Sequence, residues 1–145
     1  MTTRKTPDYY YIDKEINLTV DKVLNNFAGG LNFWKSSAFK YAVRAFDKHS
    51  NPINCLNKCL NCVFLEQARH KEDVELYNYR IIRPVDLIKD FNIHKKLLNF
   101  ETFKQIETEE YKKFLVELYK WCVGLNIEKP IEDLIQKQIN KYYNN

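Results

Sequence analysis

Residues 33–48 read FWKSSAFKYAVRAFDK, and this stretch decides the fold. Its side chains fall on two neighbouring stripes with helical spacing: Phe33, Ser37, Tyr41 and Arg44 on one, Trp34, Ala38, Ala42 and Ala45 on the other. The pattern predicts a helix from about residue 32 to residue 48. The turn HSNP follows, in which Asn51 suits a helix cap and Pro52 the first helical position. We therefore expect a helical hairpin whose second arm runs to about His70.

Basic side chains gather near the junction of these two arms. They surround Tyr41 and comprise Lys40, Arg44, Lys48 and Lys58. Positive groups held together at such a junction favour the binding of an anion. The alternative is an ordinary surface pair, Lys40 and Arg44, that flanks a buried Tyr41.

Helical periodicity continues on both sides of the hairpin. Thr19 suits the cap of an earlier helix, which we expect Gly29-Gly30 to end and whose apolar face holds Val20, Val23, Leu24 and Phe27. The clearest helix opens at Thr108 and stops at Gly124, with an apolar face of Tyr111, Phe114, Leu115, Leu118, Tyr119, Cys122 and Val123. A last helix begins at Pro130 and carries Ile131, Leu134, Ile135 and Ile139 on one face.

The segment between these helices is ambiguous. Alternating Tyr77, Tyr79 and Ile81 fit a strand, but a lone strand has no partner, so a helix is favoured for residues 74–82. Short helices are expected for residues 84–91 and 93–98. The chain is thus predicted to be all-α, a compact bundle of about five to seven helices. We divide it into a module of residues 1–73 and a helical extension of residues 74–145 packed on it.

Composition narrows the class of protein. The chain has 145 residues, only three Gly and four Pro, and 10 Tyr and 9 Phe, which favours long regular elements over disorder. A net charge of +4 is too small to indicate nucleic-acid binding by itself. No run approaches the ~18 apolar residues of a membrane span, and residues 1–7 lack the apolar core of a signal peptide. We expect a cytoplasmic protein without a membrane partner.

Three cysteines and a histidine follow the turn. Cys55, Cys59 and Cys62, with His70, resemble a zinc ligand set. On one helix, however, Cys55 and His70 would lie ~22 Å apart at 1.5 Å per residue, too far to share an ion. Two of the cysteines could still ligate a metal with residues from elsewhere. We favour buried free thiols and predict no metal site.

The hairpin also resembles a known family. The residues concerned are Pro7-Asp8-Tyr9-Tyr10, Lys40-Tyr41-x-x-Arg44-Ala45-x-x-Lys48, Asn51-Pro52-Ile53 and Leu56-x-Lys58. They resemble the motifs of small phage proteins known as SaV-like or phage nucleotide-kinase-like proteins. The resemblance covers roughly residues 7–70 and needs no gap from residue 36 to residue 58. It implies a viral, phage-like origin for the chain.

The resemblance implies an activity and a site. The activity attached to the family is phosphorylation of nucleoside monophosphates without a P-loop, which would use Mg²⁺ and a nucleoside triphosphate. Carried over by position, Lys40, Arg44, Lys48 and Lys58 would hold phosphates, and Tyr10 and Tyr41 would pack against base or sugar. The catalytic residue stays unassigned.

The chain also departs from the family pattern. A Gly-Asn pair is Ser36-Ser37 here, a Gly-Lys pair is Phe46-Asp47, and a Glu-Asp pair is Asn54-Cys55. Two function classes therefore stay open. The first is a nucleotide-binding protein, in its active form a divergent nucleoside monophosphate kinase. The second is a non-catalytic interaction protein, a homo-oligomer or host-factor antagonist, whose interface would include an exposed Tyr142-Tyr143. A weaker third reading is nucleic-acid binding by the same basic junction.

Overall fold

The computed structural model describes residues 8–48, 51–77 and 82–143. Its α-helices are α1 (Val20–Leu24), α2 (Phe33–Lys48), α3 (Ile53–Tyr77), α4 (Phe91–Leu97), α5 (Glu109–Val123) and α6 (Ile131–Tyr143). Short 3-10 turns are η1 (Asp8–Tyr10), η2 (Pro84–Leu87) and η3 (Phe100–Thr102). Strands β1 (Tyr11–Asp13) and β2 (Leu18–Thr19) pair antiparallel. The all-α helical bundle expected from the sequence is confirmed; the small sheet was not predicted.

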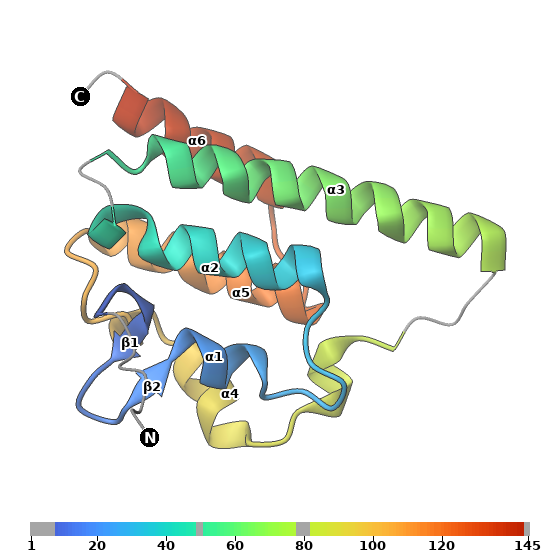
Figure 1. The fold of residues 1–145 in the computed structure, drawn as a ribbon, viewed down its shortest axis with the longest axis horizontal. Coiled ribbons are helices and arrows are strands. Elements are labelled where there is room, and N and C mark those ends of the chain that lie inside the picture. Colours follow the sequence, from blue (N-terminus) through green and yellow to red (C-terminus); the bar gives the residue numbers. More distant parts are fainter. Residues whose placement is uncertain (1–7, 49–50, 78–81, 144–145) are drawn as a thin grey trace, which may run out of the picture.

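Four helices make the body of the bundle. Helices α2 and α3 form the expected antiparallel hairpin, α5 packs on α2, and α6 packs on both α3 and α5 (Figure 1). The sheet, α1 and α4 lie together below α2 and α5 in the same view, and the far end of α3 reaches beyond the other helices. Among the described residues, no helix is both long enough and apolar enough to cross a bilayer. The division of the chain at residue 73 stays a prediction.

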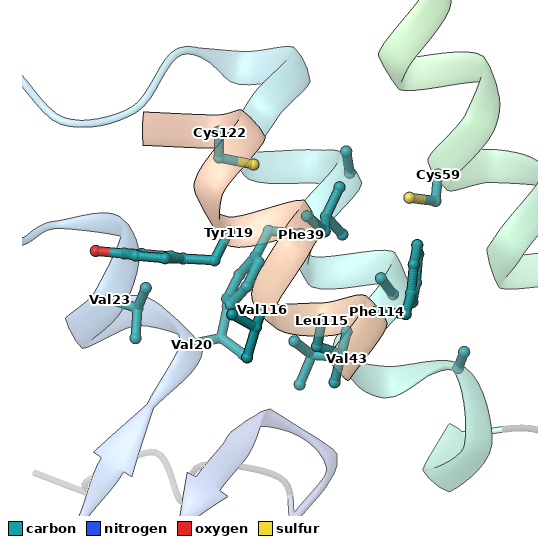
Figure 2. Packing of buried hydrophobic residues seen from close by; sticks show 14 of the residues in the cluster. Val20, Val23, Phe39, Val43, Cys59, Phe114, Leu115, Val116, Tyr119 and Cys122 are labelled. Carbon is teal, nitrogen blue, oxygen red and sulfur yellow. The ribbon is translucent and has the colours of Figure 1, made fainter. Parts of the chain in front are cut away.

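Helix α5 supplies the centre of the core. All seven apolar positions predicted from its periodicity are buried. Figure 2 shows several of them, including Phe114, Leu115 and Tyr119, against Phe39 and Val43 of α2 and Val20 of α1. Gly124 ends the helix with φ of +88°, a left-handed conformation that glycine adopts without steric cost. Sequence periodicity thus located both the length and the buried face of this helix.

Helix α1 is shorter than the sequence predicted. Thr19 caps it as expected, but the helix ends at Leu24 and not at Gly29. The following residues bond to a distant segment: Asn26 Nδ2 donates to the Asp90 carbonyl at 2.8 Å, and Asp90 N donates to Asn26 Oδ1 at 2.9 Å. Phe27 pairs with Ile88 in an isolated bridge. The backbone pairs with the same segment, since Ala28 N donates to the Leu87 carbonyl at 2.8 Å and Lys89 N donates to the Asn26 carbonyl at 2.9 Å. These backbone bonds take the place of helical ones, so the expectation of a longer helix was wrong.

The middle of the chain also departs from expectation. Helix α3 continues without a break past His70 to Tyr77, so residues 74–77 belong to it, and residues 78–81 of the predicted helix lie outside the described residues. After Pro84 only the short turn η2 forms, because Ile88 enters the bridge with Phe27. Helix α4 corresponds to the helix predicted for residues 93–98. A local sequence pattern could not anticipate the bridge between Phe27 and Ile88.

The cysteines are buried thiols, as favoured. Cys55, Cys59, Cys62 and Cys122 are all unpaired and buried. Burial raises the pKa of Cys59 well above its usual range and that of Cys122 to about 12, so both stay protonated at neutral pH. They act as small apolar side chains in the core.

The C-terminal tyrosines do not form the expected exposed pair. Tyr143 is 71% exposed, but Tyr142 is half-buried with its ring centroid 5.1 Å from that of Phe46. Consecutive residues on a helix point about 100° apart, so one faces α2 while its neighbour faces water. The expected exposure is therefore wrong for Tyr142, and the interface itself stays a prediction.

A buried histidine predicts a pH-dependent stability. His94 Nδ1 lies 2.7 Å from the hydroxyl of Tyr119, and burial lowers the pKa of His94 below its usual value near 6.5. The unfolded chain therefore takes up this proton first as pH falls, which favours unfolding. We expect the melting temperature to fall as the pH drops through 6.5 toward the lowered pKa, and to fall less in His94→Leu. An equal slope in both proteins would contradict this role of His94.

Candidate functional site

Arg44 is the centre of the predicted anion site. Its Nη1 donates to the hydroxyl of Tyr10 at 3.1 Å, which links α2 to η1. Its guanidinium carbon lies 4.7 Å from the ring centroid of Tyr41, one turn earlier on α2. Nε is buried without a hydrogen-bond partner, and no described residue bonds to Nη2. The arginine is thus held in place while part of its donor capacity stays unused.

Lys58 approaches the same aromatic ring from α3. Its Nζ lies 5.5 Å from the ring centroid of Tyr41, so this ring has a cation from each arm of the hairpin. An aromatic face attracts a cation by about 0.5–1 kcal/mol at exposed sites. The structure therefore brings together Tyr10, Tyr41, Arg44 and Lys58, which we call the basic–aromatic cluster.

Lys40 and Lys48 complete the predicted set. Lys40 lies one helical turn before Arg44, a spacing that places the two Cβ atoms about 5–6 Å apart. It is half-buried, and in the described part of the chain only Arg44 and Lys58 lie over the ring of Tyr41. Lys48 lies on α2, but its side chain is outside the described residues. Four of the six predicted residues therefore meet, and Lys40 is their neighbour on the helix.

The cluster lacks acidic partners among the described residues. Lys40, Arg44 and Lys58 form no ion pair there, whereas nearby Lys14 pairs with Asp8 at 3.0 Å. Like charges this close repel one another unless an anion or solvent compensates them. The positive potential of the cluster is therefore available to an anionic ligand.

The packing of α2 against α3 sets this geometry. Ala38, Ala42 and Ala45 are completely buried along one side of α2, within the bundle that α2 forms with α3 and α5. The hairpin turn is fixed at its end by Asn51, whose Oδ1 accepts from Ile53 N at 2.9 Å. The predicted cap at Asn51 thus places the first turns of α3, including Lys58, beside Tyr41.

The described part of the cluster suits a phosphate better than a bare Mg²⁺ ion. Magnesium takes oxygen ligands, above all carboxylates. Cys55 stands where the family resemblance implies an acidic residue, and its thiol is buried. Among the described residues, no three His, Cys, Asp or Glu side chains gather as a metal site. No step through a protein-bound metal follows from these residues.

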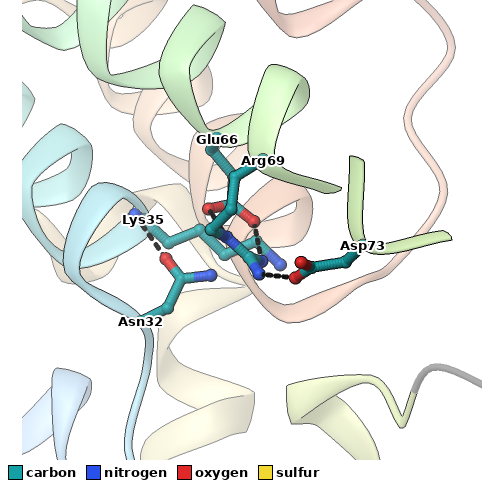
Figure 3. A network of polar contacts seen from close by, with 5 residues as sticks. All are labelled: Asn32, Lys35, Glu66, Arg69 and Asp73. Carbon is teal, nitrogen blue, oxygen red and sulfur yellow. Dashed lines mark hydrogen bonds and ion pairs between the residues drawn. The ribbon is translucent and has the colours of Figure 1, made fainter. Parts of the chain in front are cut away.

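A second polar group was not singled out from the sequence. Glu66 on α3 has a carboxylate only 3% exposed, and both of its oxygens accept from Arg69, at 3.1 and 2.6 Å. Arg69 also pairs with Asp73 (Figure 3). A cavity of about 330 Å³ adjoins this group and is lined by Lys35, Glu66, Gln67, His70 and Trp121. One feature of the sequence indicates this buried charge. Glu66 continues the helical stripe of Leu56, Cys59 and Val63, at a position where an apolar residue is expected.

Comparisons with known proteins add no family to this geometry. No protein-family model, no curated protein and no solved structure matches the chain. Function must therefore be argued from the chemistry of the cluster.

Proposed function

We propose that the protein binds a nucleotide through its phosphates at the basic–aromatic cluster. The observation that carries the proposal is the arrangement around Tyr41, where Arg44 and Lys58 both lie against one ring and neither has an acidic partner among the described residues. Guanidinium and ammonium donors are the groups that proteins use to hold phosphate. Lys40 lies close enough along α2 to join them.

The aromatic part of the cluster supports a nucleotide over a simple inorganic anion. Tyr10 and Tyr41 place two phenol rings beside the cations, and aromatic rings of this kind stack on bases. The hydroxyl of Tyr10 also fixes the orientation of Arg44. The resemblance to phage nucleotide-kinase-like proteins, made on these same residues, is consistent with this ligand. The proposal concerns binding, and phosphoryl transfer is a separate measurement.

Nucleotide binding predicts a thermal shift. At a nucleotide concentration one hundred times Kd, a ligand that binds only the folded state stabilises it by about 2.7 kcal/mol. For a chain of this size the melting temperature would then rise by roughly 5–10 °C. Nucleoside mono-, di- and triphosphates of each base, with and without Mg²⁺, form the panel. We expect Arg44→Ala to abolish the shift and Lys58→Ala to reduce it.

The control variant is Lys71→Ala, which removes an exposed lysine from the other half of α3. It removes the same net charge as Lys58→Ala, but from a position outside the basic–aromatic cluster. We therefore expect it to keep the full thermal shift. Inorganic phosphate tested alone separates a simple anion site from a nucleotide site. If no nucleotide shifts the melting temperature, or if all three variants respond alike, the cluster is not a nucleotide site.

Phosphoryl transfer is tested on the same panel. The protein is incubated with a radiolabelled triphosphate, Mg²⁺ and each nucleoside monophosphate that shifts its melting temperature. Labelled nucleoside diphosphate from the monophosphate would extend the proposal to kinase activity, with Arg44→Ala as the inactive control. Binding without product would limit the function to nucleotide binding.

A specific observation supports testing the second function class, an interaction protein. Phe64 and Leu65 are adjacent on α3, and 51% and 39% of these large apolar side chains are exposed. If no nucleotide binds, light scattering of the protein in solution measures its oligomeric state. A dimer that Phe64→Ser disrupts would favour self-association over nucleotide binding.

A further inference from the structure

The cavity beside Glu66 lies away from the basic–aromatic cluster. On α2, Lys35 and Arg44 are nine residues apart, which corresponds to about 13 Å along the helix axis and to opposite sides of it. The cavity measures about 330 Å³, within the range of pockets that hold small molecules, about 300–1,000 Å³. Its walls come from α2, α3 and α5, so three rigid elements define its shape.

Acidic groups around the cavity are already paired. The Glu66 carboxylate accepts two hydrogen bonds from Arg69, one from Nε and one from Nη2, and the third nitrogen, Nη1, donates to Asp73. Glu132 of α6 accepts from Gln67 Nε2 at 2.9 Å. The charge of Glu66 is therefore compensated by Arg69, and Glu132 does not line the cavity.

The hydrogen-bond donors of three other side chains that line the cavity, in contrast, have no acceptor among the described residues. Lys35 forms no ion pair with a described residue, and its Nζ lies 5.9 Å from the ring centroid of Trp121. No described residue accepts a hydrogen bond from the indole N–H of Trp121, and His70 at the edge of the cavity is exposed and has no described partner. The cavity thus combines unpaired donors with an aromatic wall. This combination suits a ligand that is anionic at one end and flat and apolar at the other.

We propose that this cavity binds a small aromatic carboxylate. The carboxylate lies beside the ammonium of Lys35, in a wall that also holds His70 and Trp121. The ring of the ligand packs against Trp121. The Glu66–Arg69 pair closes the inner side and holds α3 in place, without contributing free charge.

Trp121 provides a direct probe of occupancy. The chain has two tryptophans, and Trp34→Phe leaves Trp121 as the single tryptophan while retaining an aromatic ring beside Phe33. In this background we expect 4-nitrobenzoate, whose nitroaromatic ring quenches indole emission, to quench in a saturable manner. The neutral 4-nitrobenzyl alcohol carries the same ring without the charge and should give only the linear quenching of random collisions.

Lysine variants decide whether Lys35 holds the anion. Lys35→Ala should weaken 4-nitrobenzoate binding at least tenfold, and Lys35→Arg should restore most of it. Lys113→Ala is the matched control, since Lys113 also lies over an aromatic ring, 5.2 Å from the centroid of Phe100, but outside this cavity. Melting temperatures confirm that each variant is folded. Linear quenching by 4-nitrobenzoate, equal quenching by the alcohol, or equal affinities of the Lys35→Ala and Lys113→Ala proteins would each overturn the proposal.

Discussion

Replacing Tyr111 by alanine is expected to lower the free energy of unfolding by about 4 kcal/mol. The side chain is completely buried at the start of α5, with ring centroids 4.7 Å from Phe46 and 5.3 Å from Phe114. Its hydroxyl donates to the carbonyl of Ala42 at 2.5 Å. Truncation removes the ring, leaves a cavity between α2 and α5, and deletes this hydrogen bond.

Two further variants separate these contributions in urea unfolding. Tyr111→Phe keeps the ring and should cost only about 1 kcal/mol, because a single hydrogen bond is lost. Tyr143→Ala removes an equally large tyrosine that is 71% exposed and should change stability by less than about 0.5 kcal/mol. A loss below about 2 kcal/mol in Tyr111→Ala would mean that α5 does not anchor the core as described.

Tyr111 also shows what the sequence could predict. Its position follows from a spacing of three and four residues that continues through α5 to Val123, and every residue of that stripe is buried. The same spacing located α2, and the cap signal of Asn51 and Pro52 located the start of α3. Helices of this length that bury one continuous face can be recognised from the sequence, because each apolar residue is followed by another one helical turn later.

Long-range pairings were not accessible in this way. Helix α1 ends early because the backbone of Asn26 and Ala28 bonds to Lys89 and Leu87, far along the chain, and the side chain of Asn26 bonds to Asp90, 64 positions away. The sheet of β1 and β2 is similarly short, with only three and two residues, too few for alternation to be recognised. No local pattern in residues 24–30 carries information about residues 87–90. Predictions failed where a side chain or backbone found its partner far along the chain.

The residues of the candidate site also fall into two groups, those that a local pattern predicted and those that depend on long-range packing. Tyr41, Arg44 and Lys58 were predicted together because they lie on two helices joined by one short turn, whose pairing follows from the hairpin. Tyr10 was predicted only through the family resemblance, and its bond to Arg44 depends on how η1 packs. The cavity beside Glu66 was missed, since Trp121 reaches it from a helix more than fifty residues away.

Replacing Arg69 by alanine tests that missed group and is expected to cost about 3 kcal/mol of unfolding free energy. The carboxylate of Glu66 is 3% exposed, and Arg69 is the described residue that bonds to it. Removing Arg69 leaves this charge in the protein interior without a partner. We place the cost at the lower end of the range for buried pairs because Arg69 itself is 42% exposed and water can approach from its side.

The reverse substitution should be much milder, and this asymmetry is the sharper test. Glu66→Gln removes the buried charge, while Arg69 keeps Asp73 and solvent, so we expect a loss of only about 1 kcal/mol. The double variant Glu66→Gln/Arg69→Ala should then be more stable than Arg69→Ala alone, because no unpaired charge remains inside. Urea unfolding of the three variants measures the cycle. Additive losses, with the double variant the least stable, would show that the pair does not compensate a buried charge.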